Sequence, residues 1–153
     1  MTRIRIAIGV CATIAALAAL ATASPAADKK LYATMSGSQE RPAAGDPDGT
    51  GTAVLTVTSR RVCYDIRPRR AGLTFAAAHI HVGARGRAGD VLIPLFSAPK
   101  RVTRGRLAGC SPTVRPADLR KVTARPGRYY LNLHNAAYPA GAIRGQLTAS
   151  RPR

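Results

Sequence analysis

Short stretches in which apolar and polar residues alternate limit the folds open to this chain more than any other feature. A period of two is that of a β-strand with one buried face. Turn-forming residues separate the stretches, notably the glycines and prolines of 37–51 and the pair Arg60-Arg61. The first half therefore predicts three antiparallel strands, whose buried positions would be Leu31, Ala33 and Met35, then Ala53, Leu55 and Val57, then Val62, Tyr64 and Ile66.

The second half continues this pattern of short strands. A glycine-rich loop over 83–89 is expected to form a hairpin, because strand-like residues flank it on both sides. The segment over 101–107 is expected to add one short strand. Together, the strands predicted in this half cover residues 73–82, 90–96, 101–107, 128–134 and 141–147.

Two prolines refine the prediction. Pro94 cannot donate to a sheet ladder, so the strand over 90–96 is expected to lie at a sheet edge or to carry a bulge. Pro116 begins the one segment with helical character, 116–121, at a position where a helix tolerates proline. About eight short strands predict an all-β fold, an antiparallel Greek-key β-sandwich or barrel of the superoxide-dismutase-like or immunoglobulin-like kind.

Residues 1–23 have the composition of a secretory signal peptide. Two arginines precede an apolar run over 7–21, and small residues follow at a suitable cleavage position. The run is short for a bilayer span and no later stretch approaches about 18 apolar residues, so we expect a secreted product without a transmembrane anchor. After the leader we expect a flexible lead-in over 24–30, one domain over 31–149 and a basic tail over 150–153.

Cys63 and Cys110 are the cysteines that remain once the leader is removed together with Cys11. In an exported protein a pair of cysteines favours a disulfide, because the surroundings are oxidising. The alternative is that both thiolates bind a soft metal ion, although neither lies in a C-x-x-C arrangement.

The chain is strongly basic, with 24 lysines and arginines against 7 acidic residues and a formal net charge of +17. Such a charge attracts polyanions, including anionic wall or matrix polymers. The arginines are scattered among turns and are not interleaved with stacking aromatic residues, so specific nucleic-acid binding is not expected.

The three histidines are the strongest candidates for a site. His79 and His81 alternate with Ile80, so their imidazoles project from one face of a strand, about 7 Å apart. His134 ends a second predicted strand. Three imidazoles in one place would suit copper or zinc and leave a coordination position open. The alternative is structural, in which the imidazoles hydrogen-bond to loop carbonyls and fix the turn over 83–89.

Three motifs together resemble the CHRD domain, a module named after the developmental antagonist chordin and widespread in secreted microbial proteins. They are the opening Leu31–Pro42, the segment Ala78–His81 with the glycines after it, and the closing stretch Tyr130–Leu147 with its Tyr-Pro-Ala-Gly turn. The resemblance spans about residues 31–149. It implies an exported β-domain and assigns no activity.

A second similarity, to copper-zinc superoxide dismutases, implies roles for particular residues. In those Greek-key barrels a His-x-His strand and a later histidine hold copper, and an arginine near the chain end guides the anion. His79, His81 and His134 match three copper ligands, and Arg144 matches the anion-guiding arginine. The fourth copper histidine and the zinc-binding set have no counterpart in this sequence. A three-histidine copper or zinc site is what this similarity implies.

Three hypotheses of function follow, none with an assigned catalytic residue. The first is a secreted CHRD-type binding or structural module that carries a three-histidine metal site, its partner an unidentified extracellular protein or polymer. The second is a copper-only enzyme that handles superoxide. The third is a cationic adhesion module held to anionic cell-surface or matrix polymers, whose retention would depend on salt and not on histidines.

Overall fold

The computed structural model describes residues 27–151. The predicted signal peptide over 1–23 and the last two residues of the predicted tail lie outside this range. Within it, ten strands, one α-helix and two short 3-10 helices make up the domain: β1 (Lys29–Ser36), η1 (Gly37–Gln39), β2 (Thr50–Val57), β3 (Val62–Arg69), β4 (Thr74–Phe75), β5 (Ala77–Val82), β6 (Val91–Phe96), β7 (Lys100–Arg101), β8 (Leu107–Cys110), α1 (Pro116–Ala124), η2 (Pro126–Arg128), β9 (Tyr129–His134) and β10 (Ile143–Gln146).

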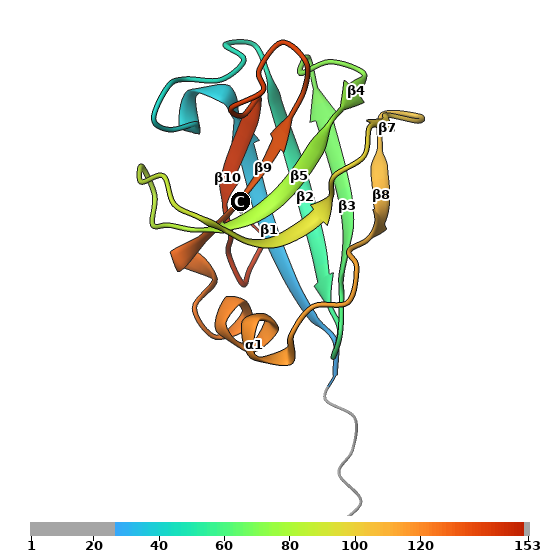
Figure 1. Cartoon of the computed structure of the whole chain (residues 1–153), viewed down its shortest axis with the longest axis vertical. Coiled ribbons are helices and arrows are strands. Elements are labelled where there is room, and N and C mark those ends of the chain that lie inside the picture. The colour runs from blue at the N-terminus through green and yellow to red at the C-terminus, as the bar shows by residue number, and fades with distance from the viewer. Residues whose placement is uncertain (1–26, 152–153) are drawn as a thin grey trace, which may run out of the picture.

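Eight of these strands form one antiparallel sheet in the order β6-β5-β9-β10-β1-β2-β3-β8. Figure 1 shows this sheet curling until it is nearly closed into a barrel, with α1 across one end. The predicted all-β, antiparallel fold of about eight strands is confirmed. Within the described residues, no helix is long and apolar enough to cross a membrane.

The order of strands explains how distant segments of the chain meet. β9 follows α1 in sequence but lies between β5 and β10, and β10 in turn lies beside β1. The two ends of the sheet are β6 and β8. Pro94 lies in β6, next to two register irregularities in its pairing with β5, so the edge strand and the bulge expected from this proline are both present.

The core lies inside the barrel, on the face that the alternating apolar residues share. Ile80 of β5 and Leu131 of β9 are directly paired and completely buried. The rings of Tyr64 in β3 and Phe96 in β6 contact each other across the interior, with centroids 5.7 Å apart. The nine residues predicted as buried positions of the first three strands are all in this core.

Several boundaries differ from the predictions. β1 begins at Lys29, inside the expected lead-in over 24–30, because Lys29 and Lys30 pair with the end of β2. The strand expected over 73–82 is divided into β4 and β5, and β4 pairs separately with β7.

The single strand expected over 101–107 is wrong. A tight turn closed by the bridge between Thr103 and Arg106 occupies the middle of that segment, where Arg104 and Gly105 both have positive φ. The chain therefore leaves β7 at Arg101 and starts β8 only at Leu107. The helical turn expected over 116–121 extends to Ala124.

The predicted disulfide is confirmed: Cys63 and Cys110 are bonded. The two residues are direct partners in the pairing of β3 with β8. The bond therefore attaches the last strand of the sheet, and with it the start of α1, to the β2–β3 hairpin. Both thiols are used in this way, which removes the alternative of a thiolate metal site.

Candidate metal centre

Strand alternation places all three histidines on the outer face of the sheet. In β5, His79 and His81 alternate with the core residues Ala78 and Ile80, and therefore point away from the interior. His134, at the end of β9, is paired with Ala77. Ala77 lies two residues before His79 in β5, so the two histidines are diagonal neighbours on one face of the sheet. The pairing of β5 with β9 thus brings the predicted residues together.

The three imidazoles form a compact cluster. One nitrogen of each ring can be chosen so that all three lie within 4.8 Å of one another. His79 Nδ1 is 3.1 Å from His134 Nε2, and the ring centroids of His79 and His81 are 5.6 Å apart. Two nitrogens bound to one zinc or copper ion at about 2.0–2.1 Å with a tetrahedral angle are about 3.3–3.4 Å apart. The His79–His134 pair is already close to that separation.

Backbone carbonyls orient two of the rings. His81 Nδ1 donates to the carbonyl oxygen of Gly89 at 2.8 Å, and His134 Nδ1 donates to that of Pro139 at 2.9 Å. A neutral imidazole carries one proton, so each of these rings keeps a lone pair on Nε2. Histidines that bind metals are commonly held in this way, with the second nitrogen on a carbonyl.

The free nitrogen of His81 is the least satisfied group in the cluster. His81 is 9 % exposed, and its Nε2 is buried without a hydrogen-bond partner among the described residues. A buried lone pair without a donor costs free energy, commonly about 1–3 kcal/mol. A cation bound at this nitrogen would remove that cost.

The surroundings keep the imidazoles neutral. Burial, together with the neighbouring rings of His134 and His81, lowers the pKa of His79 to about 4. Burial also lowers the pKa of His81 and of His134, although the hydrogen bonds to Gly89 and Pro139, and the side chain of Asn132 beside His81, act in the opposite direction. Neutral imidazole is the form that binds metal, so protons compete weakly for this cluster.

The loop over 83–90 covers one side of the cluster and is held by side chains of the same sheet face. Gly89 accepts the hydrogen bond from His81, and Gly83 accepts one from Gln146 of β10 at 2.8 Å. The hydroxyl of Tyr130 lies 3.3 Å from the amide of Gly89. The structural role considered for the histidines is thus present at His81, on one of its two nitrogens.

Arg144, predicted to guide an anion, lies on β10, two strands away from His79. Both residues are paired with Asn132 of β9, so the three lie in one row across the sheet. Arg144 is 1 % exposed. Its guanidinium is 3.3 Å from the centroid of the Tyr130 ring, and His81 stacks on Tyr130 at 4.8 Å. One terminal nitrogen donates to the carbonyls of Ala84 and Arg87, whereas Nη1 is buried and unpartnered among the described residues. Anion guidance by Arg144 stays a prediction.

Glu40 belongs to this region and was not identified from the sequence. Glu40 is 3 % exposed, and its carboxyl group lies against Gly141, where a Cβ atom would collide with it. Burial raises the pKa of Glu40 to about 7, and the cation of Arg144 opposes that shift. Glu40 lies in the opening motif Leu31–Pro42, but that motif did not indicate its burial, because the contact of this loop with the β9–β10 turn depends on the closed sheet.

Comparison with known proteins agrees with the resemblance found in the sequence. A family model for the CHRD domain matches residues 31–147, from the first core residue of β1 to the residue after β10. The match covers most of the chain. Neither the curated proteins nor the solved structures contain a significant match.

Proposed function

This chain belongs to the CHRD domain family, and from that premise we propose that it is an exported binding module that holds one copper ion on His79, His81 and His134. The observation that carries the proposal is the buried, unpartnered Nε2 of His81 beside the close nitrogen pair of the other two histidines. The disulfide supports an oxidising, extracytoplasmic location.

The donor set favours copper over other divalent ions. Three neutral imidazoles suit copper and zinc, and copper(II) binds nitrogen sites more tightly than zinc does. Without the metal, the 3.1 Å contact requires a proton on one of its two nitrogens. The carbonyl of Pro139 can only accept, so His134 carries its proton on Nδ1, and the shared proton then belongs to His79 Nδ1. This assignment requires the side-chain amide of Asn132, 3.2 Å from His134 Nε2, to present its NH2 group to that nitrogen. Coordination through Nδ1 would require His79 to change tautomer.

The test is metal binding by the purified protein without a histidine tag. We expect one copper ion per chain by elemental analysis and calorimetry, with nitrogen hyperfine coupling in the electron paramagnetic resonance spectrum of the copper(II) protein. His81→Ala should weaken copper binding by at least about 100-fold, since removing even an outer partner of a ligand costs 10–100-fold.

Thr52→Ala is the control variant, because Thr52 is an exposed polar residue on β2, outside the cluster. The control should bind copper like the parent protein. Thermal unfolding of the metal-free proteins shows whether each variant folds. The proposal is overturned if the parent protein takes up no copper or zinc at micromolar concentration, or if His81→Ala binds copper as tightly as the parent.

A superoxide-handling enzyme is the second candidate function. It is favoured by the three-ligand set, which leaves one position open, and by the cation of Arg144 in the same row of the sheet. The copper-loaded protein would then consume superoxide, and Arg144→Met would slow the reaction while leaving copper bound. A copper-loaded protein without this activity would leave the binding module as the function.

A further inference from the structure

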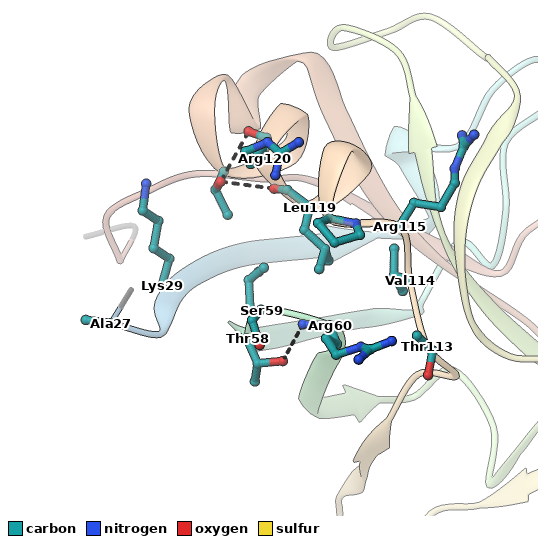
Figure 2. A pocket seen from close by; sticks show the side chains of 13 residues that line it. Ala27, Lys29, Thr58, Ser59, Arg60, Thr113, Val114, Arg115, Leu119 and Arg120 are labelled. Atoms are coloured by element: carbon teal, nitrogen blue, oxygen red, sulfur yellow. Dashed lines mark hydrogen bonds between the residues drawn. The ribbon is translucent and has the colours of Figure 1, made fainter. Parts of the chain in front are cut away.

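A groove at the α1 end of the barrel lies apart from the histidine cluster and shares no residue with it. Its volume is about 790 Å³, within the range typical of small-molecule sites. Figure 2 shows it between α1, the start of β1 and the turn after β2.

The floor of the groove is apolar. Leu119 projects from α1 toward the centre of the groove in Figure 2, and Val57 and Val114 line it from the strand and loop sides. Two of the four hydroxyl side chains on the walls make hydrogen bonds within the protein: Thr123 donates to the carbonyl of Leu119 at 3.0 Å, and Thr58 donates to that of Arg61 at 3.1 Å. Apart from the hydroxyls of Ser59 and Thr113, an occupant of the floor therefore meets mainly apolar surface.

The rim of the groove is cationic. Lys29, Arg60, Arg115 and Arg120 surround the floor, and the lining contains no carboxylate. Asp118, on the helix beside it, is bonded to Arg115 at 2.8 Å and to Lys121 at 3.2 Å. Among the described residues, Lys29, Arg60 and Arg120 form no ion pair. The rim thus retains uncompensated positive charge next to an apolar surface.

We propose that this groove binds a single-chain anionic amphiphile, of the class of a fatty-acid carboxylate. The tail would lie over Val114 and Pro116, which are partly or fully exposed above the buried Leu119 and Val57, and the head group would face Lys29 and Arg120 at the rim. A second copy of this chain is a poor occupant, because each copy has a formal net charge of +17 and brings its own basic residues.

The experiment is a titration of the isotope-labelled protein with laurate below its micellar concentration, followed by nuclear magnetic resonance. Saturable shifts are expected in the amides of Val57, Val114 and Leu119. Shorter carboxylates should bind more weakly, by about two- to four-fold for each methylene removed, as expected for burial of an alkyl chain. A cationic surfactant with the same tail should bind at least tenfold more weakly than laurate.

Paired charge reversals test the location. Lys29→Glu combined with Arg120→Glu should weaken laurate binding at least tenfold. Lys100→Glu combined with Arg101→Glu changes the net charge equally at a second basic groove, of about 530 Å³, and should leave binding unchanged. Both lysines and both arginines are exposed, so both variants are expected to fold.

Three results would overturn the proposal. Equal weakening by the two paired variants would mean that laurate follows net charge. Affinity independent of chain length would mean that the apolar floor is not used. Binding to anionic vesicles without binding to monomeric laurate would identify the groove as part of a membrane-facing surface.

Discussion

At the scale of single residues, a stack of three side chains joins the histidine cluster to the loop that covers it. Tyr130 lies between His81 and the guanidinium of Arg144. Arg144 is completely buried, and its contacts with two loop carbonyls and an aromatic face replace part of the water it has lost. Its Nη1 is buried without a hydrogen-bond partner among the described residues, and so is Oε1 of Glu40. The hydrogen-bonding capacity of these two ionisable side chains is therefore only partly used.

Glu40→Gln tests this partly satisfied region through the pH dependence of stability. The folded carboxyl group keeps its proton up to a pKa of about 7, whereas the unfolded one releases it near 4.5. The stabilisation from this group is therefore complete below pH 4.5 and lost as the pH rises through 7. At pH 8.5 we expect Glu40→Gln to be more stable than the parent by on the order of 3 kcal/mol in urea unfolding.

At pH 4.5 the two proteins should have nearly equal free energies of unfolding. Asp48→Asn, in the same loop but exposed, is the control and should follow the parent at both pH values. A constant difference between the parent and Glu40→Gln across this range would show that the folded carboxyl group titrates normally.

At the scale of elements, the loop over 83–90 is fixed by the sheet beneath it more than by its own sequence. Its carbonyls accept from His81, Arg144 and Gln146, which come from two strands. Gly89 is needed for this approach, since a Cβ atom there would collide with the carbonyl of Val82. The position of the loop and the orientation of the His81 ring therefore depend on each other.

Gly89→Ala tests this mutual dependence. The collision displaces the loop and removes the carbonyl that orients His81, so we expect copper affinity to fall by about 10- to 100-fold. Amide hydrogen exchange in the loop should become faster. The matched control is Gly127→Ala, because a Cβ atom at Gly127 meets nothing within 4 Å. Unchanged copper affinity in Gly89→Ala would show that this carbonyl does not orient the ligand.

At the scale of the whole molecule, the disulfide determines how firmly the end of the sheet is held. Cys63 and Cys110 are 47 residues apart, and β8 has no sheet partner beyond β3. We expect Cys63→Ala combined with Cys110→Ala to lower the free energy of unfolding by about 4 kcal/mol, the value that chain entropy gives for such a loop. Urea unfolding of the oxidised parent and the double variant measures the difference.

The double variant should keep its affinity for copper, because both cysteines lie outside the histidine cluster. A reduced parent protein should unfold at the same urea concentration as the variant. Copper binding lost together with the disulfide would mean that coordination involves the sulfur atoms.

The sequence predicted the features that depend on local pattern. Alternation identified the core residues of β1, β2 and β3, and the face shared by His79 and His81, because these depend on neighbours one or two positions away. It did not show that β9 would insert beside β5, which brings in His134; that grouping was a hypothesis from the strand position of His134, and a resemblance added to it. The burial of Arg144 and Glu40 had no local signal, because loops distant in sequence bury them.

The error over 101–107 has a different origin. Val102 and Leu107 gave the segment a strand-like composition, but the chain turns between them through two residues of positive φ, one of which, Arg104, is not a glycine. The composition of this segment is compatible with a strand. It does not indicate a chain reversal in which an arginine adopts a positive φ.

Because β5 and β9 direct their imidazoles outward and their aliphatic side chains inward, folding and coordination depend on separate sets of residues. We expect a descendant of this chain that exchanges all three imidazoles to keep the same core, although the loop over 83–90 would lose its contact with His81. The same scaffold can therefore display unrelated chemistries on that surface, and a shared domain architecture does not by itself imply a shared ligand.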